Sequence, residues 1–297
     1  MVAEATLVGS RRARRRTVLG CCAALALVLL PRPGGSRAAA AQRIVSVGGA
    51  LTEIVYRLGA QGALVATDTT SMWPEPARAL PKVGYMRTLS AEGVMSMQPT
   101  LLLAPAEAGP ATVLQQLQAA GVRIVRASNE HSFDALLANV TLVAEAIDRR
   151  TEGAALSAEL KREWSATRAQ LAGKPAPKVL FILSHAANNV QVAGGGTAAD
   201  AMIRLAGGTN AMTGFTGYKP LSAEAAIGAA PDVILVTREG LEAVGGVDTL
   251  LARPGLALTP AGKNRRVVAL DALYLLGFGP RLPQAVAELA RGIGTLA

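Results

Sequence analysis

Short apolar runs recur along most of the chain, and each run is followed by a stretch with helical spacing. The runs are apolar throughout rather than at every second position, which is typical of parallel strands covered on both faces. Strands that alternate with helices in this way predict an α/β fold with a parallel sheet. The predicted strands are 43–47, 64–66, 101–104, 122–125, 179–183, 233–236 and 266–270.

The alternation stops in the middle of the chain, where residues 132–171 carry no strand pattern. Alanine, leucine, glutamate, lysine and arginine dominate there, and these residues favour a helix. Helix of this length, at ~1.5 Å per residue, forms a stiff connector rather than a flexible linker. The chain therefore divides into a first Rossmann-like βα lobe at 42–130, a helical connector at 131–176 and a second such lobe at 177–297.

One stretch occurs twice, once in each predicted lobe. It reads V-G-Y-M-R-T-L-S-A-E-G-V-M-S-M-Q-P at 83–99 and G-Y-K-P-L-S-A-E-A-A-I-G-A-A-P at 217–231. Glu92 and Glu224 occupy matching positions in the two copies. A repeat at so large a spacing indicates two similar lobes rather than a stacked array. Each copy predicts a glycine-flanked loop, a short helix that begins at a serine, and a buried strand. We expect the two copies to face each other across a ligand cleft.

Residues 1–41 have the composition of an export signal. Arginines at 11–16 precede an apolar core at 18–30, and small residues follow at 38–41. This order is typical of a signal peptide, and the core is too short for a transmembrane helix. The motif R-R-T-V-L at 15–19 resembles the twin-arginine signature. Paired arginines also occur in ordinary signal peptides, so both export routes stay open.

Removal of this leader changes the charge and the cysteine content of the chain. The leader holds both cysteines and most of the net charge of +9. The mature protein is therefore expected to contain no disulfide and no thiolate ligand. Its remaining basic excess is mild and indicates no nucleic-acid partner.

Few side chains of the mature protein suit catalysis. The sequence contains no recognisable Ser/His/Asp arrangement, and its two histidines, His131 and His185, are too few for a metal site built on several histidines. The glycines at 194–196 lack the lysine of a P-loop and predict a tight turn. His131 adjoins a predicted helix start, where a structural role is expected. The sequence therefore favours a binding protein over an enzyme, and it indicates no catalytic cofactor.

Tyr85 is the residue best suited to hold a ligand that contains a metal. It lies in a glycine-flanked loop with Lys82 and Arg87 on its two sides. A neighbouring cation favours phenolate over phenol. A phenolate is a hard anionic ligand for ferric iron, and tyrosine is a known axial ligand of haem. From the residues alone, packing of Tyr85 at the surface stays open as the alternative.

Several segments, spread over the mature chain, carry a resemblance to a known family. They are R-I-V-S-V-G-G-A-L-T-E-I-V-Y-R-L at 43–58, V-G-Y-M-R-T-L-S-A-E at 83–92, F-I-L-S-H at 181–185, V-A-G-G-G-T-A-A-D-A at 192–201, G-Y-K-P-L-S-A-E at 217–224 and L-L-G-F-G-P-R at 275–281. The chain resembles the haem-binding periplasmic proteins of bacterial haem ABC importers, in the helical-backbone class of substrate-binding proteins. The resemblance implies that Tyr85 is the axial iron ligand, with Arg87 close to its oxygen or to a haem propionate.

The resemblance implies further contacts with haem. Some members hold a second, stacked haem through a histidine of the second lobe, and His185 lies in the matching segment. Other members share such a histidine without using it, so both roles stay open. Tyr218, the repeat counterpart of Tyr85, is expected to line the cleft, and Met86 is expected to pack rather than to bind iron.

The candidate propionate partners are Lys82, Lys219 and Arg238. Exposed lysines and arginines are usually just solvated, which is the alternative for all of them. Arg238 is favoured because it follows a predicted strand at the sheet edge that faces a ligand crevice.

Glu92 and Glu224 receive a separate role from the resemblance. Carboxylates at such positions in the family meet basic pockets on the two copies of the permease. The expected partners are therefore haem, an inner-membrane ABC permease with its ATPase, and an outer-membrane haem receptor upstream. The protein itself is expected to be a periplasmic monomer. A local role is the alternative, because a carboxylate in the first turn also stabilises a helix through its dipole.

Two other functions stay open on the sequence. The same fold could hold a corrinoid or a ferric siderophore, but the metal in those ligands is largely saturated and does not need Tyr85. A secreted two-domain enzyme could use the same cleft, but the sequence offers no recognisable nucleophile–base pair for it.

Overall fold

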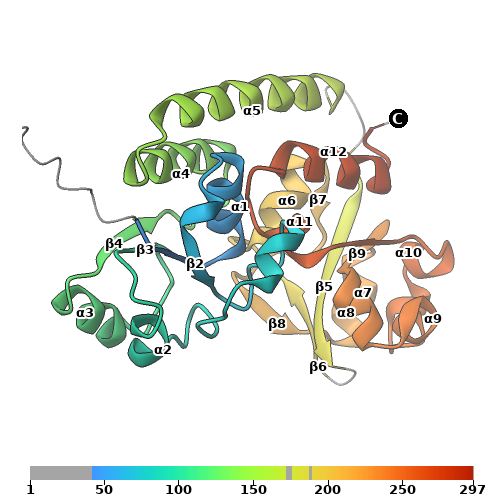
Figure 1. Cartoon of the computed structure of the whole chain (residues 1–297). Coiled ribbons are helices and arrows are strands. Elements are labelled where there is room, and N and C mark those ends of the chain that lie inside the picture. The colour runs from blue at the N-terminus through green and yellow to red at the C-terminus, as the bar shows by residue number, and fades with distance from the viewer. Residues whose placement is uncertain (1–41, 172–175, 187–188, 297) are drawn as a thin grey trace, which may run out of the picture. The chain divides into compact units, whose positions relative to one another are not determined.

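The computed structural model describes residues 42–171, 176–186 and 189–296, and Figure 1 shows the arrangement of its helices and strands. The predicted leader at 1–41 lies outside the described residues. All described residues belong to one structural unit, which is built on two β-sheets. The predicted α/β fold, with two lobes and a long connecting helix, is confirmed. The boundaries assigned to the lobes stay a prediction.

The first lobe contains a four-stranded parallel sheet with the strand order β2-β1-β3-β4. All side chains of β1 are buried, as expected for a central strand covered on both faces. The predicted strands are present, with ends that differ by no more than two residues. The elements are β1 (Ile44–Ser46), α1 (Gly49–Arg57), β2 (Leu64–Thr67), α2 (Ala91–Met95), β3 (Leu101–Pro105), α3 (Ala111–Ala119) and β4 (Arg123–Ala127).

The second lobe contains a six-stranded mixed sheet, and here the prediction of a parallel plan is wrong at one edge. The order is β10-β9-β5-β6-β8, with β7 also paired to β5, and β6 runs antiparallel to both of its neighbours. Its strands are β5 (Lys178–Ala186), β6 (Asn189–Ala193), β7 (Thr209–Asn210), β8 (Tyr218–Pro220), β9 (Val233–Thr237) and β10 (Val267–Leu270). The connection from β5 to β6 is too short for a parallel crossover, so these strands pair as a hairpin. The alternation N-V-Q-V-A in β6 is the overlooked signal of a half-buried strand.

Two helices in the middle of the chain join the lobes. α4 (Phe133–Ala146) packs on α1, and α5 (Arg150–Leu171) packs on both α4 and α12 (Leu282–Ile293) of the second lobe (Figure 1). Trp164 of α5 stacks on Phe133 of α4 with ring centroids 4.7 Å apart. The long helix is therefore fixed to both lobes, which is the arrangement that a stiff connector requires.

The remaining helices flank the second sheet. They are α6 (Ala198–Leu205), α7 (Ala223–Ala229), α8 (Arg238–Ala243), α9 (Gly246–Leu251), α10 (Pro260–Lys263) and α11 (Ala272–Leu276). Short 3-10 helices lie in the first lobe at Gln61–Ala63 and Glu75–Ala79, and in the second lobe at Leu256–Leu258. The largest buried cluster extends from α1 and α4 through α5 to α12, so the lobes and the connector share one core. Within the described part of the chain, no helix is long and apolar enough to cross a membrane.

The repeated stretch adopts the predicted helix and strand in both copies. The serine before each helix accepts a hydrogen bond from the backbone N–H three residues on, at 3.3 Å for Ser90 and 3.1 Å for Ser222. A buried strand follows each helix, β3 in one lobe and β9 in the other. The copies differ before the helix, because Tyr85 lies in a turn whereas Tyr218 begins β8.

Candidate functional site

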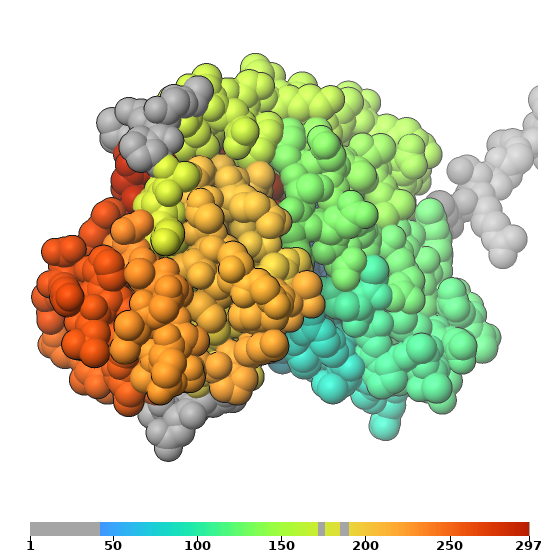
Figure 2. Space-filling model, turned by 180° about the vertical axis from the view of Figure 1, so that it is seen from behind, coloured from blue at the N-terminus to red at the C-terminus, as the bar shows by residue number. Residues whose placement is uncertain are grey.

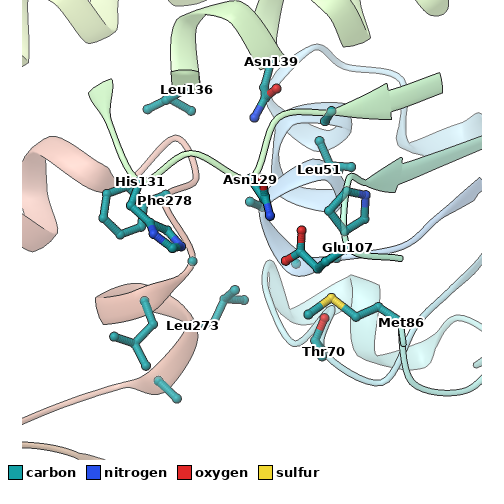
Figure 3. A pocket seen from close by; sticks show the side chains of 18 of the residues that line it. Leu51, Thr70, Met86, Glu107, Asn129, His131, Leu136, Asn139, Leu273 and Phe278 are labelled. Carbon is teal, nitrogen blue, oxygen red and sulfur yellow. The ribbon is translucent and has the colours of Figure 1, made fainter. Parts of the chain in front are cut away.

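A cavity of about 540 Å³ lies between the two lobes, and its wall is mainly apolar (Figure 3). The first lobe contributes the start of α1 and residues of the segments that follow β2, β3 and β4, and the second lobe contributes Glu239 and residues 271–273 and 276–278. An apolar hollow with a few polar groups, at the carboxyl ends of parallel strands, is the usual form of a small-molecule site. The labelled wall residues are Leu51, Thr70, Met86, Glu107, Asn129, His131, Leu136, Asn139, Leu273 and Phe278. In the space-filling view from behind, the lobes meet along a furrow (Figure 2).

A second hollow, of about 330 Å³, adjoins the cavity and shares part of its wall. It differs from the cavity in charge, because Arg238 and Arg281 line it together with Arg78, which lines both, beside the exposed ring of Trp73. Glu75 and Asp271 add two carboxylates to its wall. Arg238 begins α8 directly after β9, so it lies at the sheet edge where the sequence placed it. Sequence reasoning missed Arg78 and Arg281. Three guanidinium groups around one hollow suit a ligand that bears carboxylates.

Tyr85 lies in a turn next to Met86, which lines the cavity, and 38% of its surface is exposed. Tyr85 itself is not among the described residues that line the cavity. Gly84 precedes it with a φ of 100°, in the region that glycine adopts most readily. Nη1 of Arg87 donates a hydrogen bond to the phenol oxygen, and its guanidinium lies 5.8 Å from the centre of the ring. A charged donor at this oxygen stabilises the negative charge that a metal-bound phenolate carries. The structure thus brings together the two residues on which the sequence analysis depends.

The turn that carries Tyr85 is fixed by the loop after β3. The N–H of Gly109 donates to the carbonyl of Met86 at 3.0 Å, and the N–H of Leu89 donates to the carbonyl of Gly109 at 2.9 Å. The side chain of Met86 lines the cavity and packs against the core of the first lobe. The side chain of Met86 thus packs in the structure, and its expected lack of an iron contact stays a prediction.

The ammonium group of Lys82 is bonded within the first lobe. Its Nζ donates to Oγ1 of Thr67 at 2.7 Å, and to the carbonyl oxygens of Ala77 at 2.9 Å and Ser71 at 3.4 Å. Burial lowers the pKa of Lys82, and the charge of Asp68 partly offsets this shift. These contacts favour a structural role, and contact between Lys82 and a propionate stays a prediction.

Tyr218 and Lys219 lie on β8, and neither is among the described residues that line the cavity. Burial raises the pKa of Tyr218, and a hydrogen bond with Thr197 partly counteracts that shift. Nζ of Lys219 lies 4.7 Å from the centre of the Phe215 ring. His185 contributes backbone to β5, and its side chain lies outside the description. The ligand contacts of these three residues stay predictions.

His131 lies in the cavity wall, where sequence reasoning did not place it (Figure 3). The centre of its ring is 5.0 Å from that of Phe278 in the other lobe, with the planes inclined by 53°. Burial lowers the pKa of His131, and the negative charge of Glu107 acts against this shift. The signal that could have found His131 is its position shortly after β4, at the carboxyl edge of a parallel sheet.

An ion pair between Glu53 and Arg281 joins the lobes at the second hollow. Nε of Arg281 lies 3.0 Å from each carboxylate oxygen of Glu53, whose side chain is only 4% exposed. The guanidinium also lies over the rings of Trp73 and Tyr274, at 4.7 and 5.0 Å from their centres. Burial raises the pKa of Glu53, and Arg281 opposes this shift. Burial and the neighbouring Glu288 raise the pKa of Tyr274 to about 12.

The chain matches the model of the periplasmic binding protein family over residues 44–274. It belongs to that family. The two lobes, the cleft between them and the long helix are therefore the frame of a periplasmic binding protein, and its family consists of substrate-binding proteins rather than enzymes. Membership also indicates a location outside the cytoplasm.

Solved structures similar to this periplasmic binding protein include haem-binding proteins. BhuT, a periplasmic haem-binding protein in complex with two haems, is 50% identical, with a TM-score of 0.83 over 86% of this chain and 99% of that chain. RhuT from Roseiflexus sp. RS-1, in its apo form, is 44% identical, with a TM-score of 0.82 over 85% and 98%. HutB of Vibrio cholerae is 38% identical, with a TM-score of 0.76 over 84% and 98%.

Curated relatives with lower identity include a protein that binds another ligand. The vitamin B12-binding protein of Vibrio vulnificus (strain CMCP6) is 25% identical over 261 residues, which cover 88% of this chain and 93% of that protein. The ABC transporter substrate-binding lipoprotein YvrC of Bacillus subtilis (strain 168) is 28% identical over 256 residues, which cover 85% and 80%. Membership of the family alone therefore does not identify the ligand, and the residues of the cleft have to be considered.

Glu92 and Glu224 lie in the first turns of α2 and α7, on different lobes, and both are exposed. Hydrogen bonds from the backbone N–H of Glu224 and from the hydroxyl of Ser222 lower the pKa of this carboxyl group. The matching positions in the repeat thus become matching surface carboxylates on the two lobes. Their contact with a permease stays a prediction.

Proposed function

We propose that this protein captures ferric haem between its lobes and delivers it to the permease of an ABC importer. The observation that carries this proposal is the Tyr85–Arg87 pair, in which a guanidinium donates to the phenol oxygen beside an apolar cavity. A tyrosine supported in this way suits ferric haem as an axial ligand, and an apolar wall suits the porphyrin face. The likeness to BhuT, which holds two haems, supports the same ligand class.

The distribution of charge around the cleft supports one orientation of the haem. The cavity wall is mainly apolar, whereas Arg238 and Arg281 line only the adjoining hollow, together with Arg78, which lines both. Haem carries its propionates on one edge, and guanidinium groups bind carboxylates with charge-assisted hydrogen bonds. We therefore expect the propionates to lie at the arginines and the hydrocarbon edge to enter the cavity. Lys219, on the exposed strand β8, is a further candidate partner.

A second haem, held by His185 and lined by Tyr218, is part of the proposal. Its support is the segment that contains His185, which resembles the matching segment of two-haem family members, together with the two haems of BhuT. The measurement that decides this point is the number of haems per chain.

Glu92 and Glu224 are proposed to dock the protein onto the permease. Both are exposed, and they lie on helices of different lobes that α5 joins. A nearly fixed separation lets two carboxylates engage two basic pockets at once, and linked contacts gain from effective concentration. In this proposal, ATP hydrolysis by the importer's ATPase drives transport, and an outer-membrane receptor supplies the haem. The protein itself acts as a monomer and catalyses no reaction. The leader directs its export, by the twin-arginine or the general route.

A corrinoid is the second candidate ligand, because vitamin B12-binding proteins of Vibrio are among the relatives. The cobalt of a corrinoid is largely coordinated before the corrinoid binds to a protein. Such a ligand would therefore not need Tyr85 as a metal ligand or Arg87 to support it. This difference favours haem.

Parallel titrations of purified residues 42–297 with hemin and with cyanocobalamin test the proposed function. We expect saturable binding of hemin with a shifted Soret band, and no saturable binding of cyanocobalamin at the same concentrations. Tight binding of cyanocobalamin together with weak, unsaturable binding of hemin would overturn the proposal.

A further inference from the structure

Glu107 brings a carboxylate to the Tyr85–Arg87 pair. Its Oε1 lies 3.8 Å from Nη2 of Arg87, and the same guanidinium donates to the phenol oxygen of Tyr85 through Nη1. Glu107 also lines the cavity (Figure 3). One arginine therefore contacts both a candidate iron ligand and a carboxylate in the ligand cleft.

The second carboxylate oxygen of Glu107 lacks a hydrogen bond within the described part of the chain, so Glu107 depends on Arg87 to compensate its charge. Oε2 is buried, and among the described residues no hydrogen-bond donor reaches it. The side chain of Glu107 is 29% exposed and that of Arg87 is 51% exposed, so the buried part is Oε2, whose negative charge the nearby guanidinium compensates. Removal of either charge leaves the other less well compensated, so the side chains of Arg87 and Glu107 are energetically coupled.

Backbone hydrogen bonds hold the two loops in register. The loop after β3, which carries Glu107, exchanges hydrogen bonds with the turn that carries Tyr85, from Gly109 to Met86 at 3.0 Å and from Leu89 to Gly109 at 2.9 Å. The approach of Glu107 to Arg87 therefore belongs to a fixed arrangement of the backbone. It differs in this respect from an ion pair between two mobile surface side chains, whose contribution is small.

We propose that Glu107 is a positioning residue for the iron ligand, which holds Arg87 at the Tyr85 oxygen and partly offsets its positive charge. This inference rests on the proposed function, because it takes Tyr85 as the ligand of ferric haem. An uncompensated guanidinium draws negative charge from a phenolate, which weakens donation to ferric iron and favours the ferrous form. A carboxylate behind the guanidinium reduces this effect, as partners behind the ligands do at other metal sites.

The substitution Glu107→Gln tests the proposal, because it keeps the shape of the side chain and removes its charge. In the haem-loaded variant we expect the phenolate-to-iron charge-transfer band at shorter wavelength, a higher ferric/ferrous reduction potential, and dissociation of hemin about 10-fold faster. Glu107→Asp keeps the charge, so its band should lie closer to that of the wild type. Glu145→Gln, on the exposed side of α4, is the control for loss of one negative charge and should change none of these quantities.

A measurement on the haem-free protein separates positioning from folding. The Nη–H groups of Arg87, which face Tyr85 and Glu107, should exchange with solvent faster in Glu107→Gln than in the wild type. The melting temperature of Glu107→Asp should stay close to that of the wild type. If the wild type shows the charge-transfer band and Glu107→Gln leaves the band, the potential and the exchange rate unchanged, the inference is overturned and the proposed function stands. Absence of the band from the wild type would overturn the proposed function, and this inference with it.

Discussion

Nε of Arg281, at the start of α12, lies 3.0 Å from both carboxylate oxygens of Glu53 in α1. The two residues are 228 positions apart in the sequence and belong to different lobes. Their ion pair borders the arginine-lined hollow, so the lobes are joined beside the ligand cleft as well as through α5. The relative placement of the lobes therefore depends in part on one buried carboxylate.

Loss of Arg281 should destabilise the protein more than loss of the charge on Glu53. Arg281→Ala leaves a buried carboxylate without its cation, and we expect the free energy of unfolding to fall by about 3–5 kcal/mol. Glu53→Gln leaves a guanidinium that is 23% exposed and still lies over Trp73 and Tyr274. We expect this variant to lose about 1–2 kcal/mol. Urea unfolding of both variants at pH 7 measures the difference.

The loss of unfolding free energy in Arg281→Ala, relative to the wild type, should become smaller as the pH falls. Burial raises the folded-state pKa of Glu53 above its ordinary value of 4.5, so the folded protein binds this proton more tightly than the unfolded chain. The cost of the ionised carboxylate is fully present above the folded pKa, and it is relieved as pH falls through that value. Removal of Arg281 raises the folded-state pKa of Glu53 further. The difference in unfolding free energy between Arg281→Ala and the wild type should therefore be smaller near pH 5 than at pH 7. A gap independent of pH would contradict this account.

Lys82 and Lys219 should respond differently to replacement by methionine. Lys82→Met removes hydrogen bonds to Thr67 and Ala77, and we expect a loss of about 1–3 kcal/mol in stability with little change in hemin affinity. Lys219→Met, on the exposed strand β8, should leave stability unchanged and weaken hemin binding. Thermal melting and hemin titration of both variants check this. A large fall in hemin affinity for a stable Lys82→Met would instead support Lys82 as a propionate partner.

Two haems per chain are expected in the wild type if His185 holds the second one. Titration of His185→Ala should then saturate at one haem per chain. The phenolate-to-iron charge-transfer band, which depends on Tyr85, should be retained. Lys178→Ala, an exposed position at the start of the same strand, is the control and should leave the number of haems unchanged. Saturation of the wild type at one haem would remove His185 from the site.

Transport should depend on Glu92 and Glu224, whereas haem binding should not. Each carboxylate makes at most a weak contact alone, but the two act together when both lobes engage the permease. We expect Glu92→Ala plus Glu224→Ala to lower protein-stimulated ATPase activity of the reconstituted importer about 10-fold. Normal stimulation would refute docking through these residues, and weakened hemin binding would show that they contribute to the ligand cleft.

Those parts of the fold that follow from local pattern could be predicted from the sequence. Continuous apolar runs identify parallel strands, serine caps identify the starts of α2 and α7, and the absence of a strand pattern identifies the connector. The pairing of β6 was missed because a five-residue alternating run next to a glycine-rich turn gives a weak signal. It needed a comparison of its period with that of β5.

Long-range pairings in the site could not be predicted in the same way. The spacing of Tyr85 and Arg87 placed them in one turn, and their hydrogen bond follows from that proximity. The approach of Arg281 to Glu53 and of His131 to Phe278 depends on how the lobes pack, and no local pattern encodes that packing. Residues at the carboxyl ends of strands, such as Glu107 after β3, could have been listed as candidates from topology alone.

The most direct test of the central claim is the resonance Raman spectrum of the ferric haem complex of residues 42–297. Excitation in the charge-transfer band should enhance iron–phenolate vibrations in the wild type and in Tyr56→Phe, a matched control in α1. It should enhance none in Tyr85→Phe, because that variant lacks the oxygen that binds iron. Iron–phenolate vibrations that persist unchanged in Tyr85→Phe would contradict the account.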